Sequence, residues 1–355
     1  MNTQLAGDDR GFPWGSNNPT TAQRIAVALV LAVAAGALHY FRAGERGGLS
    51  DFSQLWYGAS MLIDGRNPYL LIGPHRLINM PTPLFYPATA FVAVMPLTLF
   101  PFHAAGAVFI FLSTLLLAWG ATADGWHRLP LFPSVAFLTS AQLGQWSILM
   151  TAAVFIPAVA LVAVAKPQSS LAIVGSSPRR LAFVASVVGG IILLVVSFML
   201  MPEWPREWWR MLGTTDYFVA PIARTGGLVI ALVLLRWKRS EAWLVFIAAC
   251  LPQTWYPYNG LLLLVVASTY REACTLSLIS SAVWMVVYLF IPGEMRSPAT
   301  RELWGTVLVA SSYLPAVLLI LRRPNEGQGP WWFDAYAQYR QNRLTPNVKT
   351  SHEVV

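Results

Sequence analysis

Long apolar runs, separated by short polar segments, limit what this chain can fold into. Residues 181–201, for example, contain no Asp, Glu, Lys or Arg. A helix needs about 20 consecutive apolar residues to cross the hydrocarbon core of a membrane. Charged residues make up 11% of the chain and its mean hydropathy is +0.54, whereas a soluble domain carries about 25% charged residues. The sequence therefore predicts an all-α, polytopic membrane protein.

The apolar runs divide the chain into three parts. Residues 1–24 are expected to form a cytosolic tail, residues 25–321 a transmembrane domain, and residues 322–355 a cytosolic tail that is amphipathic at first and then disordered. The apolar runs are residues 25–41, 84–100, 103–121, 129–174, 181–201, 222–237, 242–252, 258–270, 274–291 and 303–321. Because several are short for a full crossing, we expect tilted or broken helices and about 10 to 11 crossings.

Basic residues indicate how these runs are oriented. The net charge is +8, and basic clusters lie beside apolar runs at residues 179–180, 236–239, 271 and 322–323. This pattern is typical of the cytosolic side of a membrane protein and of contact with anionic lipid, and it does not indicate nucleic-acid binding. Residues 42–83 then become the first extracytoplasmic loop. Further extracytoplasmic segments are residues 202–221, 252–257 and 292–301.

The long apolar stretch 129–174 leaves one point of this topology open. Successive loops alternate between the two sides of the membrane, with the first loop outside, only if the stretch crosses three times, with breaks near Gly144 and Pro157. Lys166 then lies within the membrane zone. A lysine there costs roughly 3 kcal/mol on insertion scales, so it is expected to be paired or functional. The alternative is two crossings, with Lys166 as a positive anchor at a helix end.

A polar segment in the first loop, residues 50–69, interrupts the apolar pattern. Apolar residues recur at helical spacing at positions 52, 55, 56, 59, 62 and 63, and polar residues fall mainly on the other side. Ser50 suits the N-cap, and Asp51 lies in the first turn, where the helix dipole favours a carboxylate. Gly65 and Asn67-Pro68 end the helix. Asp51 is therefore held at a defined place, unless its role is only to cap a surface helix.

A second segment with interfacial character is residues 202–210, which place three tryptophans among alternating charges. This composition is typical of a helix in the headgroup region or of an aromatic belt. Together with residues 50–64 it would frame a cavity at the extracytoplasmic face. Tyr256, Tyr258 and Asn259 would open onto the same side.

Several motifs follow one another in an order that resembles a known family. They are Asp51-Phe52, Tyr57-Gly-Ala59, Leu62-Ile-Asp-Gly-Arg-Asn-Pro-Tyr69, Pro83-Leu-Phe-Tyr-Pro87, Pro96-Leu-Thr-Leu-Phe-Pro101, Gly144-Gln145, Ala165-Lys-Pro-Gln168 and Arg206-Glu-Trp-Trp209. The order resembles the GT-C polyprenyl-phosphate-dependent glycosyltransferases of the bacterial alpha-mannosyltransferase type, glycosyltransferase family 87. The likeness spans residues 50–259 and is strongest in the first loop.

The resemblance implies a GT-C-like bundle with amphipathic helices in its first extracytoplasmic loop, in the bacterial plasma membrane. It implies transfer of a mannose-like sugar from a polyprenyl phosphate to a lipid or glycan hydroxyl on the extracytoplasmic face. Asp51 matches the family's catalytic acidic residue and would act as general base. Lys166 is the first candidate to bind the departing phosphate. The donor is a substrate, so no cofactor is expected; the need for a divalent metal stays open.

Other residues are weaker candidates for binding the donor phosphate or the substrates: Arg66, His75, Arg76, Arg224, Gln54, Gln145, Tyr256 and Tyr258. For each first-loop cation taken singly, a solvated or headgroup-binding surface is the favoured explanation. Cys250 and Cys274 have no metal-ligand spacing, so no metal site is predicted. The chain has no Asp-x-Asp motif of the kind typical of nucleotide-sugar enzymes and no glycine-rich phosphate loop, which disfavours nucleotide-sugar enzymes and ATP-driven pumps.

The chain also departs from the family pattern. It reads Thr254-Trp-Tyr-Pro-Tyr258 where the family usually has Ser-Trp-x-His-Tyr, and residues 220–227 replace an Asn-rich motif. The missing histidine favours one alternative, a catalytically inactive GT-C-like scaffold. Another alternative is a polytopic transporter or lipid flippase in which Asp51 and Lys166 form a charge pair. A transporter is expected to have two similar halves, and the sequence has no convincing internal repeat.

Overall fold

The computed structural model describes residues 19–45, 50–214, 218–290 and 298–333. The α-helices in these ranges are α1 (Thr21–Glu45), α2 (Asp51–Ile63), α3 (Pro68–Leu71), α4 (Ala88–Val94), α5 (Phe102–Ala121), α6 (Val135–Leu143), α7 (Ser147–Phe155), α8 (Pro167–Ser176), α9 (Arg180–Leu200), α10 (Trp204–Leu212), α11 (Ser240–Cys250), α12 (Leu261–Leu264), α13 (Tyr270–Phe290), α14 (Pro298–Leu308) and α15 (Leu314–Leu321).

Tighter or wider helical turns connect these elements. The 3-10 helices are η1 (Met95–Leu99), η2 (Leu129–Leu131), η3 (Pro157–Ala165), η4 (Pro221–Ala223), η5 (Gly227–Arg236) and η6 (Pro257–Gly260), and η7 (Val309–Tyr313) is a π-helix. β1 (Ile72–Gly73) pairs in parallel with β2 (Ile78–Asn79). The described chain is thus mainly helical, as its composition predicts.

Five of the described helices are long and apolar enough to cross a membrane: Thr21–Ala43, Phe102–Ala121, Arg180–Leu200, Tyr270–Phe290 and Thr300–Leu321. Each contains or overlaps a predicted apolar run. The first begins at Thr21, the start of α1, which is four residues before the predicted boundary at residue 25. Ala88–Leu99, Gly227–Arg236 and Ser240–Cys250 are shorter apolar helices. The total number of crossings stays a prediction.

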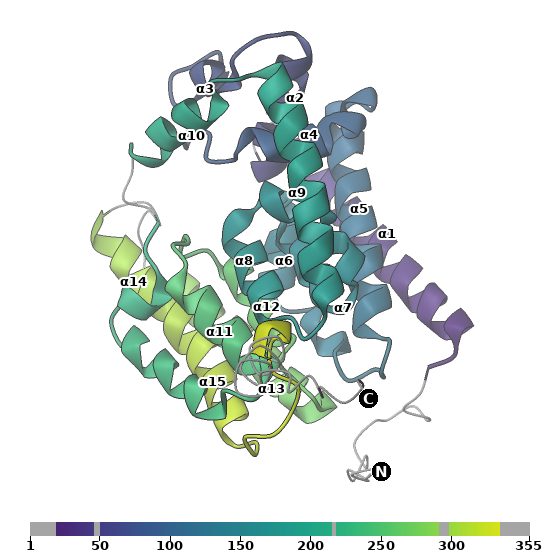
Figure 1. Cartoon of the computed structure of the whole chain (residues 1–355), viewed down its shortest axis with the longest axis vertical. Coiled ribbons are helices and arrows are strands. Elements are labelled where there is room, and N and C mark those ends of the chain that lie inside the picture. Colours follow the sequence, from purple (N-terminus) through teal and green to yellow (C-terminus); the bar gives the residue numbers. More distant parts are fainter. Residues whose placement is uncertain (1–18, 46–49, 215–217, 291–297, 334–355) are drawn as a thin grey trace, which may run out of the picture.

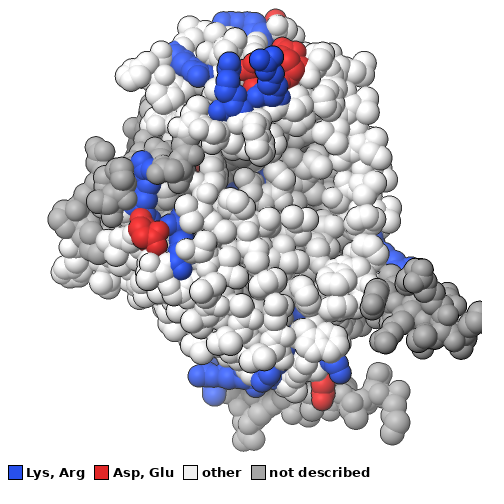
Figure 2. Space-filling view, turned by 60° about the vertical axis from the view of Figure 1, so that its left-hand side comes forward, with Lys and Arg blue, Asp and Glu red and all other residues white. Residues whose placement is uncertain are grey.

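A broad apolar band separates charged ends of the molecule. On the face seen in Figure 2, most Lys, Arg, Asp and Glu side chains gather near the top and bottom, with one further group at the left. Apolar side chains of α9 are widely exposed within the chain, among them Val184 (51%), Ile191 (57%) and Val195 (52%). Soluble monomers rarely expose such large apolar patches. This band is the surface that a membrane helix would present to lipid.

The first loop and the basic clusters lie at opposite ends. In Figure 1, α2, α3 and α10 lie at the upper end, and α13 and α15 are labelled at the lower end. At the lower end, Arg323 pairs with Glu272 at 2.6 Å, and Arg236 donates to the carbonyl oxygen of Arg323. The backbone N–H of Trp331 donates to the carbonyl of Ser177 at 3.0 Å, close to residues 179–180. The basic clusters predicted to share one side of the membrane therefore share one end.

The apolar stretch 129–174 forms short helices rather than long ones. Gly144 has φ 69° and ends α6 in the left-handed conformation that glycine adopts most readily. Pro157 starts η3 and Pro167 starts α8, at points where a continuous helix would lose a backbone hydrogen bond. The predicted breaks near Gly144 and Pro157 are confirmed. Whether the stretch crosses twice or three times stays a prediction.

The helix predicted in the first loop is confirmed as α2. The Ser50 hydroxyl accepts from the Ser53 backbone N–H at 3.3 Å, and the Ser53 hydroxyl accepts from the Ser50 N–H at 2.7 Å, which forms a capping box. The burial of α2 differs from the prediction, however. Ser53 and Gln54 of the expected polar face are buried, whereas Ile63 is 54% exposed. Ser53 is part of the capping box, Gln54 bonds to Thr82 of the loop after β2, and α4, η1 and α5 pack against the helix.

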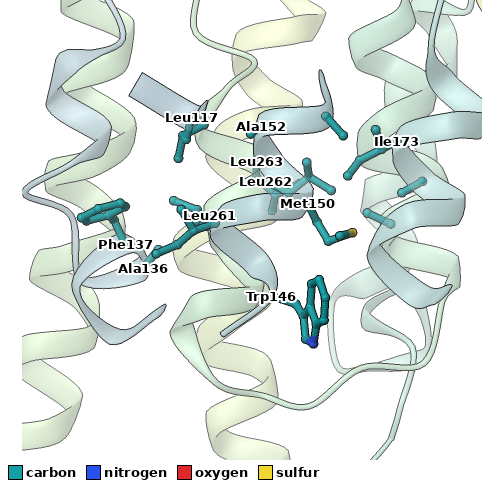
Figure 3. Close-up of a cluster of buried hydrophobic side chains, with 14 of the residues drawn as sticks. Leu117, Ala136, Phe137, Trp146, Met150, Ala152, Ile173, Leu261, Leu262 and Leu263 are labelled. Atoms are coloured by element: carbon teal, nitrogen blue, oxygen red, sulfur yellow. The ribbon is translucent and has the colours of Figure 1, made fainter. Parts of the chain in front are cut away.

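A core of buried apolar side chains lies beside the break between α6 and α7. Figure 3 shows part of this core, with Leu261, Leu262 and Leu263 between Phe137 and Ile173. Trp146 packs edge-to-face against Phe109 of α5, with ring centroids 5.1 Å apart. Protein interiors are packed as densely as organic crystals. The core therefore joins α5, α6, α7, α8 and α12 next to this break.

Candidate functional site

A cavity of about 780 Å³ lies where these short helices meet the first loop. Its walls come from α2, α6, α7, the start of α8, α13 and residues 253–259. Six residues predicted from the sequence line it: Asp51, Gln54, Gln145, Lys166, Tyr256 and Tyr258. An apolar pocket with a few convergent polar groups is typical of a ligand-binding site. This cavity is therefore the candidate functional site.

Asp51 enters the cavity from the first turn of α2. One of its carboxylate oxygens, Oδ2, accepts a hydrogen bond from the side-chain amide Nε2 of Gln145, 94 positions along the chain. The cap made by Ser50 and Ser53 holds this first turn in place. The helix dipole favours an ionised carboxylate at such a position. The sequence predicted the position of Asp51 in the first turn of the helix. It did not predict the long-range contact with Gln145.

Gly144 allows Gln145 to reach Asp51. A Cβ atom at Gly144 would lie 2.5 Å from Cβ of Phe52 and 2.9 Å from Cε1 of His39. Both distances are too short for any side chain larger than hydrogen, so only glycine lets the turn after α6 approach the start of α2 this closely. The imidazole Nδ1 of His39 lies 2.9 Å from the carbonyl of Ala141 and ties α1 to the same turn. The glycine and glutamine of this motif therefore have separate roles.

Lys166 reaches the cavity from the break between η3 and α8. Its Nζ donates to Oε1 of Gln145 at 3.2 Å and to the hydroxyl of Ser147 at 3.0 Å. It also lies 5.1 Å from the ring centroid of Tyr258, within the range of a cation–π contact. Lys166 therefore has polar partners, while the number of crossings around it stays a prediction. An ammonium group held in this way can bind a phosphate.

Aromatic rings form one wall of the cavity. Tyr256 and Tyr258 are stacked with centroids 5.5 Å apart and an interplanar angle of 6°, and Trp255 stacks on Tyr256 at 6.0 Å. Asn259 donates to the carbonyl of Thr254 at 2.8 Å, which closes the turn that carries these rings. Flat aromatic faces with hydroxyl groups at their edges suit a sugar or a hydrocarbon chain. Tyr256, Tyr258 and Asn259 all line the cavity, and the side of the membrane to which they open stays a prediction.

The two segments expected to frame the cavity both contribute to its rim. Gln54 of α2 donates to the hydroxyl of Thr82 at 3.0 Å, and Thr82 itself lines the cavity. Trp208 of α10 donates its indole N–H to the carbonyl of Phe85 at 2.7 Å. These bonds hold α2, the loop after β2 and α10 together at the upper end of the molecule in Figure 1.

The structure does not bring the other four predicted cations to the cavity. Arg66 and His75 are exposed on the first loop. Arg76 donates to the carbonyls of Tyr69 and Ile72 and so braces that loop. The side chain of Arg224 is buried and pairs with Glu302 of α14 at 3.3 Å. The residues next to Arg76 and Arg224 in the sequence do not indicate these partners, because tertiary packing determines them.

Two further residues at the site were not singled out by the sequence analysis. Tyr86 donates its hydroxyl to Oε1 of Gln145 at 3.3 Å, and Ser147 accepts from Lys166. Tyr86 lies within the Pro83-Leu-Phe-Tyr-Pro87 motif, so the resemblance contained a signal for it. Ser147 lies two residues after Gln145 in the first turn of α7, and nothing in the sequence distinguishes it from a helix cap.

Comparisons with known proteins add no identification. No protein-family model matches the chain, and neither the curated proteins nor the solved structures yield a match. Among the described residues, no group of three or more His, Cys, Asp or Glu is arranged to hold a metal ion.

Proposed function

We propose that this chain is an integral-membrane glycosyltransferase that moves a sugar from a polyprenyl phosphate to a hydroxyl group of a lipid or glycan. The observation that carries the proposal is the convergence of Asp51, Gln145 and Lys166 on one largely apolar cavity. Displacement at a glycosyl phosphate needs a base for the acceptor and a cation for the leaving group. The same three residues belong to the motifs that resemble the GT-C family.

Each residue has a distinct role in this reaction. The acceptor oxygen attacks the anomeric carbon, the bond from that carbon to the phosphate oxygen breaks, and its electron pair leaves with the phosphate. Asp51 takes the proton of the attacking hydroxyl as general base. Lys166 binds the polyprenyl phosphate and stabilises the negative charge that develops on it. Tyr256 and Tyr258 line the part of the cavity next to Lys166 and would contact the sugar there.

The two edges of the cavity suit substrates of different character. Met285 and Tyr288 of α13 line the cavity, yet they are 52% and 68% exposed, so the cavity reaches the apolar surface on that side. This edge suits a prenyl chain that extends into lipid while its phosphate meets Lys166. Pro81 and Trp208 lie at the edge beside the first loop, from which an acceptor hydroxyl would arrive.

The remaining features of the proposal rest on the resemblance and on the distribution of positive charge. They are a GT-C-like bundle of about 10 to 11 crossings, a bacterial plasma membrane, a cavity that opens to the extracytoplasmic side, and a mannose-like sugar. The lipid partners are the polyprenyl phosphate and the surrounding bilayer.

Substitution of the base tests the proposal. We expect Asp51→Asn to bind a polyprenyl-phosphate-mannose donor but to lose about 10²- to 10⁴-fold in turnover, because general-base catalysis contributes about that much. Asp64→Asn is a matched control, since Asp64 lies at the other end of α2, is exposed and is not part of the cavity wall. Sugar transfer by purified Asp51→Asn protein at the wild-type rate would show that the assignment is wrong.

A second candidate, transport or flipping of a lipid, is favoured by one observation. Asp51 and Lys166 face a cavity that reaches the apolar surface, and charged groups in such places often mark transport pathways. Movement of labelled donor across proteoliposomes without covalent transfer would support this function. If neither transfer nor movement occurs with any acceptor, an inactive scaffold is favoured, in keeping with Pro257 at the position of the family histidine.

A further inference from the structure

The amide of Gln145 lies between two groups of opposite charge. Its Nε2 donates to Asp51, and its Oε1 accepts from Lys166 at 3.2 Å and from Tyr86 at 3.3 Å. A carboxylate only accepts hydrogen bonds and an ammonium group only donates them, so the amide has a single orientation that satisfies both. Gln145 is 2% exposed, and hydrogen bonds in such a setting polarise one another.

We infer that Gln145 is a positioning residue that couples the phosphate-binding cation to the general base. This inference rests on the roles proposed above for Asp51 and Lys166. With the cavity empty of donor, the ammonium group polarises the amide, and the amide N–H then stabilises the ionised form of Asp51. A phosphate at Lys166 neutralises that ammonium group and weakens the polarisation. Asp51 therefore becomes a stronger base once the donor is in place.

The position of Gln145 is fixed from both sides along the chain, and a residue that links two charged groups needs such a fixed position. Gly144 brings the turn against Phe52, and α7 starts directly afterwards at Ser147. The other ionisable groups on the cavity wall are Arg42, Tyr86, Tyr256, Tyr258, Tyr288 and Tyr313. Of these groups Tyr86 bonds to the Gln145 amide itself, so a variant at Gln145 removes the link that both Tyr86 and Lys166 have to Asp51.

The dependence of transfer on pH tests the inference. We expect Gln145→Leu to move the acidic limb of kcat/KM to higher pH by about one to two units, because a hydrogen bond to a charged group contributes about 1.5 to 3 kcal/mol. Ser147→Ala is the matched control: it also removes a partner of Lys166 but leaves the contact to Asp51. It is expected to raise the KM for the donor and to leave the acidic limb in place.

A purely structural role for Gln145 would give a different result. Transfer by Gln145→Leu with the wild-type acidic limb, or an equal shift in Ser147→Ala, would overturn the inference. Gln145→Asn keeps an amide on a shorter side chain that cannot span both groups, and the same shift is expected of it if Gln145→Leu does not fold.

Measured binding of undecaprenyl phosphate tests this inference without requiring sugar transfer, and so separately from the proposed function. In a double-mutant cycle we expect the effects of Asp51→Asn and Gln145→Leu on Kd to differ from additivity by about fivefold or more. Additive effects would overturn the coupling. Wild-type protein that binds this lipid with the expected coupling but transfers no sugar would instead contradict the proposed function alone.

Discussion

At the residue scale, the site depends on one glycine as much as on its charged groups. Gly144 has a positive φ, and its missing side chain leaves room for Phe52 and His39. Without this close approach, the amide of Gln145 would be displaced from Asp51 by the width of a methyl group or more. Hydrogen bonds weaken steeply over such distances.

A pair of glycine substitutions measures this requirement. We expect Gly144→Ala to lower the free energy of unfolding by about 2 to 5 kcal/mol, from the left-handed backbone and from overpacking. Gly65→Ala is the control, because Gly65 has φ 66° but an added Cβ would meet nothing within 4 Å. Its expected loss is about 1 to 2 kcal/mol. Thermal unfolding in detergent compares the two, and equal losses would contradict the close approach at Gly144.

At the scale of elements, α13 has two functions that follow from its position. Trp284 is buried and stacks on Trp304 of α14 at 5.1 Å, which joins the two helices. Met285 and Tyr288, within one turn of Trp284, are exposed and also line the cavity. This helix therefore both supports the bundle and forms an exposed wall of the cavity.

The proposed path of the prenyl chain along α13 predicts a dependence on chain length. We expect Met285→Trp to lower transfer from a long-chain polyprenyl donor by about tenfold, because overpacking costs about 1 to 3 kcal/mol, and to spare a donor of two isoprene units. Leu289→Trp lies one turn further along α13, is 64% exposed and is not part of the cavity wall. If both variants respond alike to both donors, the chain does not follow this path.

At the scale of the whole molecule, the two ends differ in construction. The lower end in Figure 1 is held by ion pairs, with Arg323 bonded to Glu241 and Glu272. The upper end is held by α10, whose Trp208 bonds to Phe85 just after the first loop, while Trp209 is 75% exposed. An exposed tryptophan next to charged residues suits the headgroup region of a membrane. The proposed topology places this end outside the cell.

Single-cysteine labelling tests that topology. In a chain with Cys250→Ser and Cys274→Ser, we expect Trp209→Cys to react with an impermeant maleimide in intact cells. Lys238→Cys, exposed at the opposite end, is expected to react only after permeabilisation. The reverse pattern would put the Asp51 cavity on the cytosolic side and would contradict the proposed reaction, since its acceptor is expected outside.

Local features of the sequence account for much of the fold. Apolar runs predicted the helices able to span a membrane, Ser50 and Gly65 predicted the ends of α2, and Gly144 and Pro157 predicted breaks. These predictions depend on the backbone preferences and hydrophobicity of neighbouring residues, which a single sequence contains. The burial of Ser53 and Gln54 was missed, because it depends on packing with other segments, such as the loop after β2 that carries Thr82.

The sequence by itself determined the helical, membrane-suited character of the chain and the presence of Asp51, Gln145 and Lys166. Only the tertiary structure decided that these three meet at one cavity, whereas Arg224 pairs with Glu302 instead. The physical reason is that side chains 94 positions apart are brought within bonding distance by dense packing between segments. Local propensity carries no information about which distant segments will pack together.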